Sequence, residues 1–126
     1  KIVEQFHPDV MALEAPFYGK DIQAMLKLGR GQGVIMAAAL IHNIPIFEYA
    51  PLLVKQSITG MGRASKEQVA YFLQKVYHLG ELPDKLDVTD AIAVAICHFI
   101  HLNKPAKSKE FKDWGDFVKK NPGRVR

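Results

Sequence analysis

Three carboxylates are, each by itself, candidates for metal chemistry. Glu14 follows the short apolar run 10–13, and Asp87 and Asp90 precede the apolar segment 91–100. Two acids at positions i and i+3 share one face of a helix. Carboxylate oxygens, without clustered Cys or His, are ligands that Mg²⁺ or Mn²⁺ prefers. The alternatives are a surface acid for Glu14, a helix N-cap for Asp87 and an acid near the positive end of a helix dipole for Asp90.

Basic and aromatic side chains near these acids could bind nucleic acid. Lys55, Arg63 in a glycine-flexed loop and Lys66 at an expected helix N-terminus could hold phosphates. Phe17 and Tyr18 could stack on exposed bases. Solvated lysines and aromatic side chains packed in the core are the alternatives, and the residues alone leave both open.

The segment 97–101 adds a Cys and two His residues to an apolar helix. His98 and His101 have an i, i+3 spacing that could hold a metal, although a polar edge on a buried helix explains them better. Cys97 is expected to be a small buried side chain and not a reactive thiol.

The glycine-rich stretch 29–33 (GRGQG) resembles a phosphate-binding loop only superficially. It lies inside a helical pattern, and no Gly-Lys-Ser/Thr follows it. Gly29 and Gly33 are one helical turn apart, so they are expected to permit close packing against another helix. That helix could belong to a second subunit.

The elements that position the acids begin with a βαβ unit. Residues 1–7 read as a helix that Pro8 ends, and the run 10–13 predicts a strand buried on both faces. A helix is expected from Asp21 to about His42, and a second strand over 44–49. This order implies parallel neighbouring strands with a right-handed crossover.

Helices fill the rest of the predicted domain. A short helix is expected over 50–57, and Ser65 with Gln68 forms a capping box that starts the next helix, which Gly80 ends. Asp87 is expected to begin a helix that is apolar nearly all round and therefore buried. The helix after Ser65 has one apolar stripe, made by Val69, Phe72, Leu73 and Val76.

Composition and charge divide the 126 residues in two. Residues 1–102 contain nine Lys/Arg and ten Asp/Glu, about −1, whereas residues 103–126 contain eight and three, about +5, giving the net +4. We expect one domain over 1–102 and a basic tail over 103–126, with a short helix around Trp114. Such a tail suits a polyanion. The single Cys fits a reducing compartment such as the cytoplasm, and charged residues interrupt every apolar run before the roughly 20 residues that a membrane span needs.

Several collinear motifs resemble the RuvC family of bacterial Holliday junction resolvases. The run 8–17 (PDVMALEAPF) resembles the second acidic motif of that family, and 87–95 (DVTDAIAVA) resembles its last. Four further runs match between them: 26–34, 46–51, 54–62 and 66–69. The similarity extends from about Gln5 to His101, which makes it far more specific than any one motif.

The resemblance implies a fold and an activity. The fold is an α/β, RNase H-like domain with a mixed sheet flanked by helices. The activity is a metal-dependent endonuclease that resolves four-way DNA junctions by paired nicking in recombination and repair. The implied cofactor is Mg²⁺, with Mn²⁺ also suitable, as two ions in each complete site. The implied partners are junction DNA, a second subunit through the 21–42 helix, and the branch-migration proteins RuvA and RuvB.

The resemblance also assigns roles to residues. The three acids described first fall on three of the four metal-holding carboxylates of the family, Phe17 on its base-contacting aromatic, and Lys55 and Lys66 on its DNA-contacting lysines. The fourth acid, an Asp on the first strand of the family, has no counterpart. We therefore expect the first strands to lie outside this chain, and the chain alone to be inactive.

Two other functions remain compatible with the residues. One is a non-catalytic, junction-binding or structural fragment. The other is an RNase H-like nuclease with a different substrate.

Overall fold

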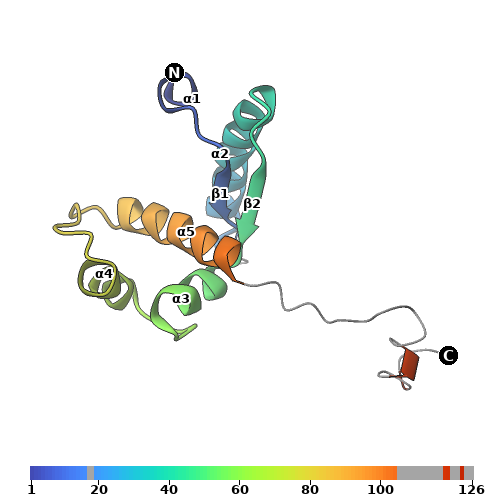
Figure 1. Cartoon of the computed structure of the whole chain (residues 1–126). Helices are drawn as coiled ribbons and strands as arrows, with labels where there is room; N and C mark the ends of the chain where they lie inside the picture. Colours follow the sequence, from blue (N-terminus) through green and yellow to red (C-terminus); the bar gives the residue numbers. More distant parts are fainter. Residues whose placement is uncertain (17–18, 105–117, 120–122, 124–126) are drawn as a thin grey trace.

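The chain forms a two-stranded sheet surrounded by helices (Figure 1). The computed structural model describes residues 1–16, 19–104, 118, 119 and 123. Its elements, in order, are α1 (Ile2–Phe6), β1 (Met11–Glu14), α2 (Ile22–Ile41), β2 (Ile46–Tyr49), α3 (Pro51–Thr59), α4 (Lys66–Lys75) and α5 (Leu86–Asn103).

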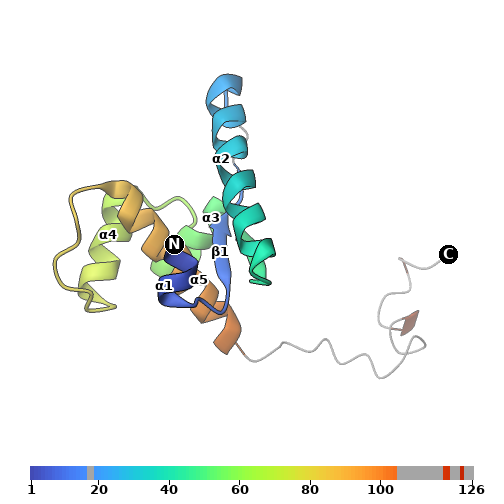
Figure 2. The same ribbon diagram turned by 90° about the horizontal axis from the view of Figure 1, so that it is seen from above.

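The predicted βαβ unit is confirmed. β1 and β2 pair in parallel, with Glu14 opposite Tyr49 at the carboxyl end of both strands. α2 begins directly after Asp21, whose carboxylate accepts a 3.0 Å hydrogen bond from the Ala24 N–H. α2 lies along one side of the sheet, and α3 and α5 lie on the other (Figures 1 and 2).

The prediction that the first strand is buried on both faces was wrong for the described residues. Every residue of β1 is only partly buried. In the part of the chain that the structure describes, β1 pairs with β2 alone, so the strand remains accessible along its other edge.

The hydrophobic core lies between α3, α4 and α5. Leu73 and Cys97 are its largest fully buried side chains, which confirms the structural role expected for Cys97. α5 packs against α3, α4 and β1. The core residues are Val54, Ile58, Ala64, Val69, Leu73, Ala93, Val94 and Cys97.

α4 begins as predicted and ends earlier. The Ser65 hydroxyl accepts a hydrogen bond from the Gln68 N–H, and the Gln68 side chain accepts one from the Ser65 N–H, which completes the capping box. The helix ends at Lys75 and not near Gly80. Val76, expected in the apolar stripe, is exposed and is the C-cap residue of this shorter helix.

α5 corrects two expectations. It begins at Leu86, with Lys85 at the N-cap position and no capping side chain, so Asp87 lies in the first turn and is not the N-cap. Only one face of the helix is buried in the described structure, and Phe99 on another face is 66% exposed.

α2 and α5 are each long and apolar enough to cross a membrane, by length and composition alone, whereas the sequence analysis found no such segment. Helices that pack in a soluble core meet the same criterion, and α5 packs on three other elements. The short helix expected around Trp114 lies outside the described residues, as does most of the basic tail.

Candidate active site

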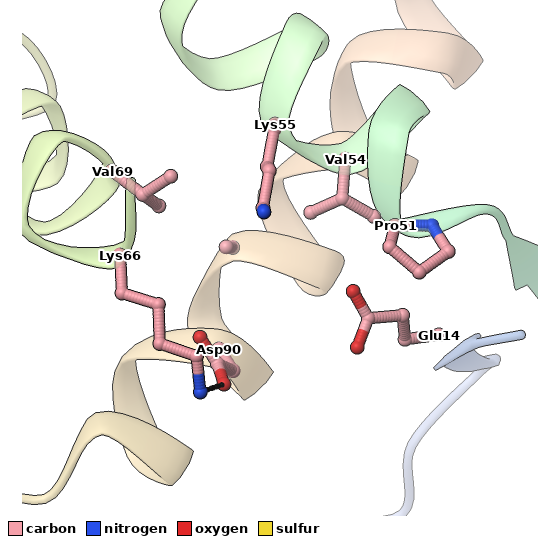
Figure 3. A pocket seen from close by; sticks show the side chains of 8 residues that line it. Glu14, Pro51, Val54, Lys55, Lys66, Val69 and Asp90 are labelled. Atoms are coloured by element: carbon pink, nitrogen blue, oxygen red, sulfur yellow. Dashed lines mark hydrogen bonds and ion pairs between the residues drawn. The ribbon is translucent and has the colours of Figure 1, made fainter. Parts of the chain in front are cut away.

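A pocket of about 300 Å³ lies at the carboxyl end of the sheet, between β1, α3, α4 and α5 (Figure 3). The charged side chains of Glu14, Lys55, Lys66 and Asp90 line it. Its remaining lining is apolar, from Pro51, Val54, Val69 and Ala93. Ligands of open parallel sheets bind beyond the carboxyl ends of the strands, which is where this pocket lies.

Backbone contacts fix the end of β1, where Glu14 is the last residue. The Ala15 N–H donates a 2.8 Å hydrogen bond to the Tyr49 carbonyl, extending the parallel ladder past Glu14. The Gln32 side chain of α2 donates a 2.8 Å hydrogen bond to the Glu14 carbonyl. Gln32 lies in the glycine-rich stretch 29–33, whose pattern gives no sign of this contact.

The Glu14 side chain points into the pocket, toward Lys55 (Figure 3). Partial burial raises the pKa of the Glu14 carboxyl, because the charged form loses solvation, and the negative charge of Asp90 raises it further. The ammonium groups of Lys55 and Lys66 act in the opposite direction. Glu14 and Asp90 are therefore close enough for their charges to interact.

Asp90 is joined to Lys66 within the lining of the pocket. Lys66 Nζ lies 3.1 Å from Asp90 Oδ2 (Figure 3). This hydrogen bond, followed by the charge of Asp90, raises the pKa of Lys66. Because the two side chains are 52% and 40% exposed, the pair is a weak one and can be exchanged for other partners.

The other predicted site residues lie farther from the pocket or outside the described chain. Asp87 is exposed and does not line the pocket, although its charge contributes to the raised pKa of Lys66. Arg63 is exposed in the loop before α4 and is not part of the lining. Phe17 and Tyr18 lie outside the described residues.

The pocket offers oxygen ligands of the kind that a hard divalent ion prefers, but it offers them from only two side chains in the described structure. Glu14 and Asp90 offer carboxylate oxygens, and the Lys66 ammonium already takes the place of a cation beside Asp90. Among the described residues, no three or more Asp, Glu, His or Cys side chains are grouped so that they could hold a metal. The two carboxylates alone would leave most coordination positions to water or to other ligands.

The two histidines of α5 have separate hydrogen-bond partners. His98 is buried, and its Nδ1 lies 2.6 Å from the Tyr49 hydroxyl. The Nδ1 of His101 lies 2.8 Å from the Cys97 carbonyl oxygen of its own helix. The structure gives the i, i+3 metal hypothesis no support, since no group of three or more potential ligands occurs among the described residues.

Comparison with known proteins identifies the family. A family model described as crossover junction endodeoxyribonuclease RuvC matches residues 1–98. The chain belongs to the RuvC family. The RuvC of Bacteroides fragilis is 54% identical over 127 residues, which cover 99% of this chain and 68% of that protein. The RuvC of Cytophaga hutchinsonii is 53% identical, over 99% of this chain and 62% of its own length.

Two solved RuvC structures share the fold. The structure of Thermus thermophilus RuvC matches with a TM-score of 0.70 and 31% identity, over 80% of this chain and 61% of that one. T. thermophilus RuvC in complex with a Holliday junction substrate matches with a TM-score of 0.73 over the same shares. These matches confirm the RNase H-like α/β class. The chain spans about two thirds of the length of the RuvC proteins that it matches, from 62% to 69% among the first four.

Proposed function

We propose that this chain forms part of a Mg²⁺-dependent endonuclease that resolves four-way DNA junctions by paired nicking, in recombination and repair. The observation that carries the proposal is the meeting of Glu14 and Asp90 with Lys55 and Lys66 in one pocket, in a chain of the RuvC family. Acids that can hold a cation lie there beside bases that can hold phosphate.

Each side chain has a distinct part in the proposed reaction. Glu14 and Asp90, with Asp87 one turn earlier on α5, would hold the divalent ions. When bound, such ions activate water and stabilise the leaving oxygen of a phosphodiester. Lys55 and Lys66 would hold the phosphates that flank the bond to be cut, and Arg63 would contact the backbone farther out.

Assembly and location follow from the same proposal. α2 exposes most of its apolar residues, including Val34 and Leu40, and only Ala39 of the helix is buried. These exposed apolar residues support a homodimer through the 21–42 helix, which would place two sites on a two-fold symmetric junction. RuvA and RuvB would act beside it, in the cytoplasm, with Phe17 and Tyr18 contacting exposed bases.

The test is cleavage of a synthetic four-way junction by the full-length protein with Mg²⁺. Asp90→Asn is expected to abolish cleavage and to preserve junction binding, because it removes a charge that would hold the ion and leaves the shape of the helix unchanged. Glu81→Gln, an exposed acid outside the pocket, is the matched control. If Asp90→Asn cuts like the wild type, the assignment of Asp90 is wrong.

One observation favours the alternative of junction binding without cleavage. In the described residues Asp90 is already paired with Lys66, and Asp87 is not among the residues that line the pocket. Gel shifts of the junction without nicking, at any Mg²⁺ or Mn²⁺ concentration, would support this alternative. Parallel assays on linear duplex and RNA–DNA hybrid distinguish a nuclease with another substrate.

A further inference from the structure

A side-chain contact joins α5 to the sheet outside the lining of the pocket. Tyr49, the last residue of β2, places its hydroxyl oxygen 2.6 Å from Nδ1 of His98 on α5. Across the described ranges, this is the one hydrogen bond between α5 and either strand. The other polar contacts of α5 with neighbouring elements are Lys66–Asp90 to α4 and Cys97–Ser57 to α3.

This bond connects the two parts of the candidate site. Tyr49 is the register partner of Glu14, and its carbonyl accepts the N–H of Ala15. His98 follows Asp90 by eight residues on the same helix, about 12 Å along its axis at 1.5 Å per residue. The bond therefore joins the end of β2, which pairs with the end of β1 that carries Glu14, to the helix that carries Asp90.

The surroundings of His98 make the bond specific. The residue is 5% exposed, and its ring centroid lies 4.6 Å from that of Phe47 on β2. Its Nε2 is buried without a hydrogen-bond partner in the described structure. The Tyr49 hydroxyl is therefore the hydrogen-bond partner of the His98 ring there. Burial also raises the pKa of the Tyr49 phenol, so the hydroxyl stays protonated, and it donates the hydrogen bond to Nδ1 in the tautomer of His98 that carries its proton on Nε2.

We infer that Tyr49 and His98 are a positioning pair, whose hydrogen bond sets α5 against the sheet and thereby fixes the separation of Glu14 and Asp90 at which a divalent ion binds. The inference rests on the proposed function, because the ion is the one that the nuclease would use. Neither residue lines the pocket, so both act through the elements that carry the acids. Metal affinity depends steeply on such supporting contacts, because they orient the ligands before the ion arrives.

The first experiment removes one oxygen atom. Tyr49→Phe in the full-length protein is expected to raise the Kd for Mn²⁺, measured by calorimetry on the DNA-free protein, by about tenfold. Junction affinity in EDTA should stay at the wild-type value, and cleavage should recover at saturating Mn²⁺. Tyr71→Phe, the same change on the exposed face of α4, is the matched control and should leave the Kd unchanged.

A second pair of variants separates positioning from packing. His98→Asn keeps an acceptor near the place of Nδ1, whereas His98→Leu keeps bulk and removes the acceptor. Positioning predicts that the Asn variant retains Mn²⁺ affinity better than the Leu variant, even if it melts at a lower temperature. The inference is overturned if Tyr49→Phe binds Mn²⁺ like the wild type, or if the Asn and Leu variants lose Mn²⁺ and junction binding alike. A wild-type protein that binds no Mn²⁺ and cuts no junction would contradict the proposed function itself.

Discussion

Single residues of the pocket carry charges that interact before any substrate arrives. The carboxylate of Glu14 loses solvation and is repelled by the charge of Asp90, whereas Asp90 forms an ion pair with the ammonium group of Lys66. Two acids in one pocket therefore have different surroundings. This difference leads to separate predictions for Glu14 and for Lys66, the partner of Asp90.

Replacing Glu14 by Gln is expected to stabilise the metal-free protein at neutral pH. The pKa of Glu14 in the folded state lies above its ordinary value of 4.5, so protonation favours folding. That contribution is complete below the unfolded pKa and is lost as the pH rises through the folded pKa. Glu14→Gln mimics the protonated form, so its Tm in EDTA should exceed that of the wild type at pH 7.

Thermal melts in EDTA across pH 4 to 8 provide the measurement for this variant, with Glu81→Gln as the control. The expected gain is small, because solvent screens a partly exposed side chain. It should shrink toward pH 4, where both states of the wild type become protonated. A Glu14→Gln protein that melts below the wild type at pH 7 would show that the carboxylate is stabilising.

Lys66→Gln is expected to affect DNA binding more than stability. Its ion pair with Asp90 is exposed, so the free energy of unfolding should fall by less than about 1 kcal/mol. A phosphate contact releases counterions, so the slope of log Kd against log salt should decrease by about 1 for the junction. Lys75→Gln at the other end of α4 is the control. An unchanged salt slope would remove Lys66 from the DNA interface.

At the scale of elements, local signals predicted the sequence of helices and strands. Asp21 caps α2, and Ser65 with Gln68 caps α4, because these bonds form between residues three apart. The βαβ unit was predictable for a similar reason, since a strand, a long helix and a strand permit few arrangements. The start of α5 was misplaced because Asp87 is a good N-cap in sequence but lies inside the first turn.

Long-range pairs could not be read from the residues alone. Tyr49 and His98 are 49 positions apart, and Lys66 and Asp90 are 24 apart. No local periodicity reports which strand end meets which helix face. Only the collinear family resemblance grouped Glu14 with the acids of α5, and it gave no reason to notice Tyr49, Gln32 or His98.

The capping box of α4 provides a prediction at the same scale. Ser65→Ala removes the acceptor for the Gln68 N–H directly beside Lys66. The free energy of unfolding should fall by about 1 kcal/mol, which urea denaturation can measure. Gln74→Ala on the exposed side of the helix is the control and should change it little. Equal losses in both variants would mean that the cap contributes nothing beyond ordinary surface substitution.

At the scale of the whole molecule, the glycines of α2 test the proposed dimer. A Cβ atom added at Gly33 or at Gly31 would meet nothing within 4 Å in a single chain. Gly33 shares a helix face with Gly29, and Gly31 is about 200° around the axis from either. Gly33→Leu is therefore expected to weaken dimerisation, measured by sedimentation equilibrium, and Gly31→Leu to leave it intact.

Both leucine variants should raise the stability of the single subunit, although Gly33→Leu weakens the dimer. Glycine inside a helix is unfavourable by about 0.5–1 kcal/mol, so either leucine should strengthen α2 within one subunit. A Gly33→Leu protein that remains dimeric would place the interface elsewhere.

The open edge of β1 has a practical consequence for anyone who produces these residues by themselves. In the described part of the chain no third strand covers that edge. Backbone N–H and C=O groups along Met11–Glu14 therefore stay available for hydrogen bonds with another polypeptide. Such edges capture extended peptides or copies of themselves. Preparations should accordingly grow turbid with concentration, and a short peptide of strand-forming sequence should keep them clear.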